Sequence, residues 1–322
     1  MTAPLRRSFE VRLDALLRAL PPHPADEFAA YLRATQTRDR DHFDSHQTDP
    51  CWMLLPRWLI SDPRFAARER HNDSDFALDV LWGQYCLFLF VRFHDDVFDD
   101  QCRSRSLLFV GDILLMESER AFAKHLDGGA FWKLFHGFVD TSIHGILRVD
   151  ALQRTADGMD LGSARVYADV NAIFKVGAAA VCVKRRRTRD LPALFAFVDE
   201  LAIASQIIDD LHDIEEDLAR RRFNFAANRL GIDRDLRQNG ASARLARAVL
   251  IEDGIGLLVD DVERGLNRAA AAIAPMGLHR ATAYVDKFRR DLATFRQSLH
   301  RTRVEHLLGF LTQDDRGSVP AS

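Results

Sequence analysis

The sequence predicts an all-α protein built as a single helical domain. Apolar residues recur every three or four positions along most of the chain, which is the spacing of one helix face. Convincing alternation of apolar and polar residues, the mark of strands, does not occur, and Gly and Pro fall between the helical stretches. Because no linker divides the chain, we expect one domain over residues 1–312 and a disordered tail over 313–322.

The individual helices follow from this periodicity. Phe9, Leu13 and Leu17 form a stripe that ends at Pro21-Pro22, a second stripe spans 25–34, and the polar residues 36–50 predict a loop. Residues 73–98 are apolar almost all round and predict a buried central helix. Further helices are expected at 105–126, 129–150, 164–183, 190–220, 241–252, 254–274 and 278–312.

Composition narrows the class of protein. The 322 residues are 47% hydrophobic and 28% charged, with a net charge of −3 that does not favour nucleic acid as a partner. The four cysteines are widely spaced and predict reduced thiols. The first residues lack the apolar core of a signal peptide, and the longest apolar runs are shorter than a membrane helix needs. We therefore expect a cytoplasmic protein without a membrane span.

An acidic stretch, HDDVFDD, follows the apolar run GQYCLFLFVRF at residues 94–100. Carboxylates held close together repel one another and are costly to desolvate, so either bulk water or a multivalent cation must offset that cost. Asp95 and Asp99 stand at i and i+4 and share one helix face.

A second acidic stretch, QIIDDLHDIEEDL at 206–218, also follows an apolar helix. Asp209, Asp213 and Asp217 stand at i, i+4 and i+8 and project from one face. If the two helices face each other, five carboxylates meet at the mouth of an apolar cavity. Oxygen ligands of this kind suit Mg²⁺, which can activate a diphosphate leaving group.

Two other interpretations compete with this one. Each acidic stretch could be an ordinary solvated helix face, although their pairing behind two apolar helices argues against it. His94-Asp95 could belong to a metal-dependent phosphohydrolase site of the HD type, with His71 as a further ligand.

The motifs resemble those of class I isoprenoid synthases. DDVFDD resembles the first aspartate-rich motif, DDxxD, and QIIDDLHD is similar to the second motif of trans-prenyl diphosphate synthases. Gly111–Leu115, GDILL, resembles the G-D-x-L-L that follows the first motif. Lys175, in YADVNAIFKVGAAA, resembles a lysine on the helix before the second motif. The resemblance covers about residues 80–230.

The resemblance implies an isoprenoid synthase fold, a bundle of helices around a deep apolar cavity with metals at its mouth. Asp95 and Asp99 would bind Mg²⁺ from one side and Asp209 and Asp213 from the other, with three ions once substrate is bound. Lys175 would contact the diphosphate of an allylic prenyl substrate. Relatives often form homodimers, so a homodimer is possible here.

Two departures favour a terpene synthase that uses one allylic diphosphate. The G-G-K-R segment of chain-elongating enzymes is absent, and the arginine segment after the first motif is shortened to QCRSRSLLFV, with Arg103 and Arg105 as possible substitutes. Asp217 matches the last ligand of the terpene-cyclase second motif. The alternatives are a trans-prenyltransferase that adds isopentenyl diphosphate and a non-catalytic protein that binds prenyl diphosphates.

Further residues are candidates for binding the two ends of the substrate. Arg220, Arg221 and Arg222 follow the second motif and could bind its diphosphate by charge-assisted hydrogen bonds. The basic run KRRRTRD at 184–190 predicts an exposed loop between helices. Four residues are candidates for the cavity wall: Phe88, Phe90, Val91 and Phe174.

Overall fold

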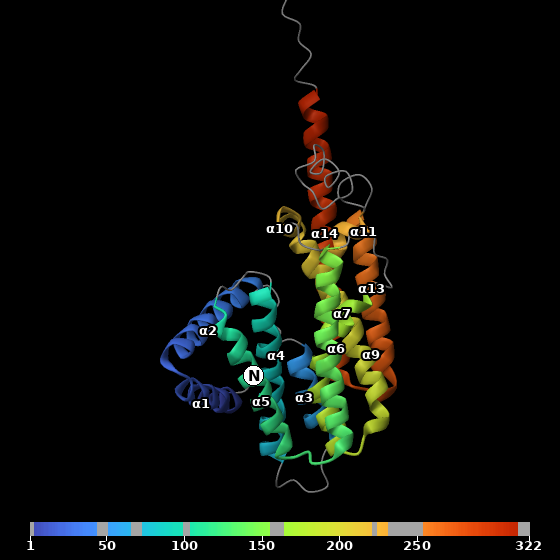
Figure 1. The fold of residues 1–322 in the computed structure, drawn as a ribbon. Helices are drawn as coiled ribbons and strands as arrows, with labels where there is room; N and C mark the ends of the chain where they lie inside the picture. Colours follow the sequence, from blue (N-terminus) through green and yellow to red (C-terminus); the bar gives the residue numbers. More distant parts are fainter. Residues whose placement is uncertain are drawn as a thin grey trace, which may run out of the picture. The chain divides into compact units, whose positions relative to one another are not determined.

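The computed structural model of the chain (Figure 1) describes residues 3–43, 51–65, 73–98, 104–154, 164–220, 224–230 and 254–314. Every regular element in these ranges is an α-helix or a short 3-10 helix. The all-α prediction is therefore confirmed. The chain forms two compact units, one from residues 1–142 and 171–198 and the other from residues 143–170 and 199–322.

The first unit is organised around one apolar helix, α4, which packs along α5 and also contacts α3 and α8. α2 packs against α5, and α1 contacts both α2 and α4. In chain order the elements are α1 (Ala3–Ala19), α2 (Pro22–Phe43), α3 (Cys51–Ser61), η1 (Pro63–Phe65), α4 (Asp73–Phe98), α5 (Ser106–Ala123), the start of α6 (Gly129–Arg154), η3 (Ala172–Lys175), α8 (Val176–Lys184), η4 (Thr188–Asp190) and the start of α9 (Leu191–His212).

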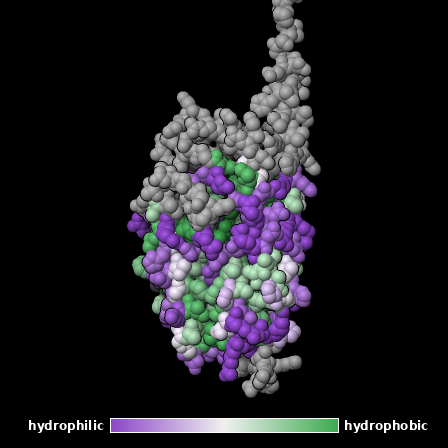
Figure 2. Space-filling model, turned by 90° about the vertical axis from the view of Figure 1, so that its right-hand side faces the viewer, coloured by the Kyte–Doolittle hydropathy of each residue, from purple (hydrophilic) through white to green (hydrophobic). Residues whose placement is uncertain are grey.

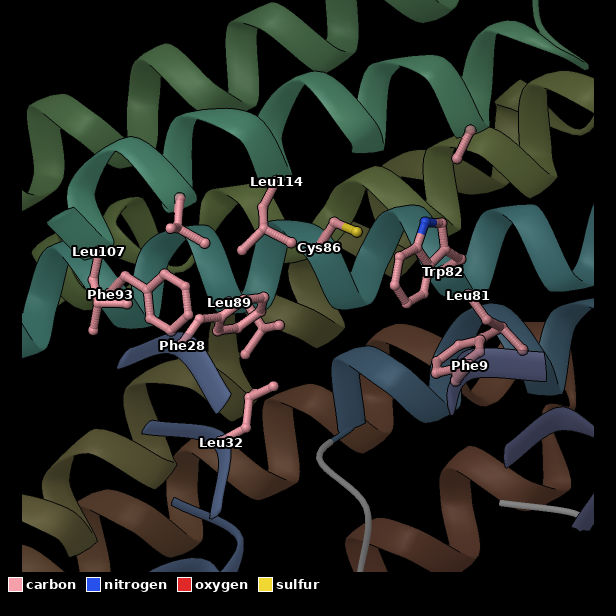
Figure 3. Close-up of a cluster of buried hydrophobic side chains, with 12 residues drawn as sticks. Phe9, Phe28, Leu32, Leu81, Trp82, Cys86, Leu89, Phe93, Leu107 and Leu114 are labelled. Atoms are coloured by element: carbon pink, nitrogen blue, oxygen red, sulfur yellow. The ribbon is translucent and has the colours of Figure 1, made fainter. Parts of the chain in front are cut away.

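The core of this unit joins α4 to its neighbours. Figure 3 shows Trp82 and Phe93 of α4 with Phe9 of α1, Phe28 of α2 and Leu107 of α5 in one buried cluster. The rings of Phe28 and Phe93 meet edge to face, with centroids 5.3 Å apart. Such pairs add to the free energy gained by burying apolar surface. The core therefore reaches Phe93, two residues before the first aspartate of HDDVFDD.

Two helical stretches are long and apolar enough to cross a membrane by length and composition, Ser74–Val97 and Thr188–His212. Their most apolar windows are 67% and 44% buried inside the protein, respectively. The core helix of a globular protein can have the same length and composition. α4 is mostly buried, as such a core helix is. On the face in Figure 2, apolar side chains reach the surface among hydrophilic ones, as is usual for folded proteins.

A close approach of α8 to α3 and α4 depends on Gly177. The Gly177 amide donates a hydrogen bond of 2.7 Å to Gln84 Oε1. A Cβ at this position would lie 2.6 Å from Pro56 Cγ and 2.7 Å from Gln84 Oε1. The glycine two residues after Lys175 is therefore required by packing.

We expect Gly177→Ala to lower the free energy of unfolding by about 1–3 kcal/mol, because the added methyl overfills a packed contact. Gly137→Ala is the matched control on α6, where a Cβ would meet nothing within 4 Å. That change should stabilise by up to about 1 kcal/mol through helix propensity. Urea unfolding followed by circular dichroism measures both, and equal effects would contradict the packing explanation.

The second unit is built mainly on two long C-terminal helices. α13 packs along α14, and α13 buries Leu258, Val262, Leu266 and Ala269 at helical spacing. Glu200 of α9 contacts α13 through an ion pair with Arg268, N to O 2.8 Å. The elements are the rest of α6, α7 (Arg165–Val170), the rest of α9, α10 (Ile214–Ala219), α11 (Phe225–Arg229), α13 (Gly254–Ile273), η5 (Ala274–Met276) and α14 (His279–Asp314).

Some element boundaries differ from those expected. α2 continues to Phe43, through part of the segment expected to form a loop; glutamine and arginine, which occur there, have good helix propensities. α3 was not expected, and it carries Pro56 in its interior. The helix expected at 164–183 is divided into α7, η3 and α8. The expected helix 241–252 lies outside the described residues, as does the tail after Asp314.

A buried carboxylate near the start of α4 joins three segments of the first unit. Asp79 forms an ion pair with Arg12 of α1, with N to O 2.7 Å. It also accepts hydrogen bonds from Lys124 Nζ at 3.1 Å and from His125 Nε2 at 2.7 Å. Burial raises the pKa of Asp79. The bonds from His125, Arg12 and Lys124 together outweigh that effect, so the pKa of Asp79 lies below its ordinary value.

The lowered pKa makes this site sensitive to acid. The stability that it contributes is complete above about pH 4, the unfolded-state value, and is lost as the pH falls through the folded-state value. We expect Asp79→Asn to cost about 1–3 kcal/mol at neutral pH and progressively less below about pH 4. Thermal unfolding of the wild type and of Asp79→Asn as a function of pH tests this prediction. A difference in stability between the two that did not change with pH would contradict it.

Candidate functional site

The first aspartate motif lies at the C-terminal end of α4, and its first two aspartates face different environments. Asp95 is exposed, whereas Asp96 is only 3% exposed. Consecutive helix residues point about 100° apart, and here that rotation turns Asp95 toward solvent and Asp96 toward the neighbouring helix α2. Asp99 lies outside the described residues. Of the two described aspartates, Asp95 is the one available to a ligand.

Asp96 is held by an anchor that sequence reasoning missed. Tyr31 of α2 donates a hydrogen bond of 2.7 Å to Asp96 Oδ2, and Arg92 Nε lies 3.2 Å from Oδ1. Burial and the bond to Asp96 raise the pKa of Tyr31, so its hydroxyl keeps its proton. The Tyr31 ring also meets Phe93 edge to face at 4.6 Å. The end of α4 is thereby fixed to α2.

His94 links the first motif to GDILL on α5. Its Nδ1 lies 2.8 Å from the Phe90 carbonyl oxygen, which can only accept, so this nitrogen carries a proton. Its Nε2 lies 3.8 Å from Asp112 Oδ1. A Cβ at Gly111 would come within 2.9 Å of His94 Cε1. Gly111 and Asp112 therefore provide the space and the charge that hold His94.

The second motif extends from α9 into α10. The Asp213 amide donates to the Asp209 carbonyl at 2.9 Å, and the Asp217 amide donates to the Asp213 carbonyl at 2.8 Å. The helical hydrogen-bond pattern thus continues across the break between the two helices. Asp209, Asp213 and Asp217 are spaced by one turn each, and Asp209 and Asp213 are exposed.

Asp210 repeats the arrangement of Asp96. It is 5% exposed and accepts hydrogen bonds from Tyr167 Oη at 2.9 Å, Gln206 Nε2 at 2.9 Å and the Phe225 amide at 2.7 Å. Burial raises the pKa of Asp210 to about 7, although these three bonds oppose the shift. The buried carboxylate therefore joins α7, α9 and α11.

Asn224 is another residue that the sequence did not reveal as part of the site. Its Oδ1 caps α11 by accepting from the Ala227 amide at 2.8 Å. Its Nδ2 donates to the Asp210 carbonyl at 2.7 Å and to Asp217 Oδ2 at 2.9 Å. One oxygen of Asp217 is thus oriented by Asn224, as metal ligands commonly are by their neighbours.

The basic candidates have different surroundings. Lys175 Nζ lies 5.7 Å from the ring centroid of Phe138 and 5.9 Å from that of Phe195, a cation–π arrangement. Arg220 is exposed and pairs with Glu216 at 2.7 Å. Arg221 and Arg222 lie outside the described residues, as does Arg103, whereas Arg105 is exposed before α5. The run 184–190 contains the turn after α8 and η4, with three of its residues partly buried.

The candidates for the cavity wall point in two directions. The rings of Phe88 and Phe174 lie 6.3 Å apart, so α4 and η3 contribute to one aromatic pair. Phe90 instead contacts His94, with ring centroids 4.5 Å apart, on the side of α5. Val91 is partly buried. Of these residues, Phe88 and Phe174 have the placement expected of a shared apolar wall.

The donor types present fit a hard divalent cation. Carboxylate oxygens are the ligands that Mg²⁺ prefers, and three exposed ones come from Asp95, Asp209 and Asp213. Within the part of the chain that the structure describes, no three His, Cys, Asp or Glu side chains converge on one point. Asp99 is not among those described residues. The first motif belongs to one unit and the second motif to the other.

Comparison with known proteins identifies the fold. No protein-family model and no curated protein sequence matches the chain. Octaprenyl pyrophosphate synthase from Helicobacter pylori has a TM-score of 0.65 and 12% identity, covering 88% of this chain and 99% of that one. Geranylgeranyl pyrophosphate synthase from Lactobacillus brevis has a TM-score of 0.66 and 14% identity, and the match covers 90% of this chain and 97% of that one.

A third structure gives the same result. Geranyltranstransferase from Thermotoga maritima has a TM-score of 0.61 and 14% identity, covering 90% of this chain and 97% of that one. At these identities the similarity establishes the architecture. The chain has the all-α fold of the prenyl synthases, the class I isoprenoid synthase fold that the motifs predicted.

Proposed function

We propose that the protein is a Mg²⁺-dependent prenyl synthase that ionises an allylic prenyl diphosphate and joins the resulting cation to isopentenyl diphosphate. The observation that carries the proposal is the pair of aspartate motifs, each following an apolar helix and each presenting an exposed first aspartate. The fold supports it, because the similar solved structures are synthases of prenyl diphosphates. This reaction was the alternative expectation from the sequence, and the neighbours favour it over the terpene synthase.

In this proposal, Asp95, Asp99, Asp209, Asp213 and Asp217 hold the metal. Mg²⁺, when bound, neutralises the charge that develops on the diphosphate as the carbon–oxygen bond breaks. Lys175 and Arg220–Arg222 would add cations for the leaving group. Phe88, Phe90, Val91 and Phe174 would line an apolar wall that shields the allylic cation from water.

A terpene synthase is the second candidate, and one sequence observation favours it. The segment between DDVFDD and GDILL is shortened to QCRSRSLLFV and lacks the R-R-G that chain-elongating enzymes use for the second diphosphate. In such an enzyme the allylic cation would cyclise or be captured by water, so isopentenyl diphosphate would not be consumed.

Product analysis by mass spectrometry separates these functions. Purified protein with Mg²⁺ would be offered geranyl, farnesyl and geranylgeranyl diphosphates, each with and without isopentenyl diphosphate. We expect a longer prenyl diphosphate that forms only when isopentenyl diphosphate is present. A hydrocarbon or alcohol formed without it would establish the terpene synthase. Absence of diphosphate release from every substrate would overturn both and favour a binding protein.

The proposed enzyme acts in the cytoplasm as a homodimer. Support for self-association comes from α5, where Phe109 is 72% exposed and Met116, two turns along the same face, is 45% exposed. A second copy of the chain that packed on this face of α5 would cover both side chains. Sedimentation equilibrium of the wild type and of Phe109→Ser tests this, and a monomeric wild type would contradict it.

A further inference from the structure

The two aspartate pairs share a division between an exposed and a buried member. In each pair the first aspartate, Asp95 or Asp209, is exposed, and the second, Asp96 or Asp210, is buried. The proposed function uses only the exposed members as metal ligands. The buried members attach each motif to other helices of its unit.

In each unit the attachment includes a tyrosine hydroxyl. Tyr31 donates to Asp96 at 2.7 Å, and Tyr167 donates to Asp210 at 2.9 Å. The residue one turn before the buried aspartate contributes as well, Arg92 in the first motif and Gln206 in the second. Because Tyr31 comes from α2 and Tyr167 from α7, different elements supply the same contact.

At the first motif, α2 contacts both flanks of the segment that carries Asp99. Tyr31 bonds to the end of α4, and Glu27, one turn earlier, accepts a hydrogen bond from Ser106 at the start of α5. Ser104 lies 2.9 Å from Ser106, oxygen to oxygen. One face of α2 therefore fixes the residues on either side of 99–103.

This attachment controls the direction in which the exposed aspartate projects. Adjacent helix residues are related by a fixed rotation of about 100°, so holding the buried carboxylate also sets the orientation of its neighbour. Metal ligands must be held within about 0.5 Å and 10–20° of the productive geometry. A helix end without an anchor frays, and both motifs lie at helix ends.

We propose that Tyr31 and Tyr167 are positioning residues that orient the metal-binding aspartates of the first and second motifs. The proposal rests on the proposed function, since it assigns the tyrosines to the same metal site. Neither tyrosine would touch the metal or the substrate. Each tyrosine holds a buried carboxylate, Asp96 or Asp210, and thereby orients the residue that precedes it in the chain, Asp95 or Asp209, which is the proposed ligand.

The chain offers two test positions and two controls, because it contains four tyrosines. Tyr31→Phe and Tyr167→Phe remove the hydroxyls and keep the rings that pack on Phe93 and Phe225. Tyr85→Phe is the control in the first unit, on the same helix as the first motif but in contact with Phe9 and Trp82. Tyr284→Phe is the control in the second unit, on α14.

Two measurements are made on each variant. One is the Mg²⁺ concentration that gives half-maximal diphosphate release, and the other is the rise in unfolding temperature caused by Mg²⁺ with inorganic diphosphate. We expect both test variants to need about tenfold more Mg²⁺, the usual effect of losing a residue that orients a ligand, and to show a smaller rise in temperature. Both controls should match the wild type. Ser106→Ala, which removes one hydrogen bond between α5 and α2, should shift the Mg²⁺ requirement in the same direction.

The outcomes separate this inference from the proposed function. If the wild type responds to Mg²⁺ and diphosphate but the test variants titrate like the wild type, the positioning role is wrong, whatever their unfolding temperatures without metal. A control that shifts as much as the test variants would also overturn it. If the wild type neither releases diphosphate nor responds to Mg²⁺ with diphosphate, the proposed function fails, and the positioning role fails with it.

Discussion

Replacing Asp95 or Asp209 by asparagine is expected to lower turnover by about 100-fold or more, with the free energy of unfolding changed by less than about 0.5 kcal/mol. Both side chains are exposed, so their replacement by asparagine removes little buried surface. Each substitution also relieves repulsion among neighbouring carboxylates. The loss would arise from one missing carboxylate in the site that stabilises the departing diphosphate.

Diphosphate release and urea unfolding measure these two effects on the same preparations. Asp75→Asn is the matched control, because Asp75 is exposed on α4 at the end opposite to the motif. It should behave like the wild type in both assays. Full turnover by both the Asp95 and Asp209 variants would remove the basis for the proposed mechanism.

Asp210→Ala is expected to cost about 3 kcal/mol of stability or more, the largest structural effect of any change considered. The substitution leaves three donors without their buried acceptor, on Tyr167, Gln206 and Phe225. Leaving a buried donor unpaired costs about 1–3 kcal/mol each. Part of that cost is offset because the Asp210 carboxylate is itself poorly solvated, as its raised pKa of about 7 shows.

Urea unfolding compares Asp210→Ala with Asp210→Asn and Asp213→Ala. Asparagine keeps an acceptor oxygen and should lose about 1 kcal/mol. Asp213 is exposed one turn from Asp209, and its removal should leave the unfolding midpoint nearly unchanged. A small loss in Asp210→Ala, equal to that in Asp213→Ala, would show that Asp210 does not hold α7, α9 and α11 together.

The sequence predicted the helical class and the central helix because both depend on local periodicity. The bounds expected for the central helix, 73–98, are those of α4. α3 was missed because its eleven residues contain a proline, which usually breaks a helix interior. Residues 164–183 are divided into α7, η3 and α8, and α8 packs against Pro56 and Gln84, contacts that no local pattern contains.

The candidate site was predictable in its exposed members and not in its anchors. Spacing alone placed Asp209, Asp213 and Asp217 on successive turns, and the backbone hydrogen bonds show that spacing. Tyr31 is 65 residues from Asp96, and Tyr167 is 43 residues from Asp210. One local signal was present, since each aspartate pair directly follows an apolar helix segment whose periodicity continues toward the core. It indicates a buried partner but not which residue supplies it.

The division within each aspartate pair also separates positions at which packing tolerates substitution from positions at which it does not. Residues 95 and 209 are exposed, so they can vary without loss of packing, whereas 96 and 210 are bound to their neighbours. Histidine at 95 or 209 would add a nitrogen ligand, which suits zinc or nickel better than magnesium. If the proposed metal site is correct, its metal preference is open to redesign while the buried scaffold that presents it stays the same.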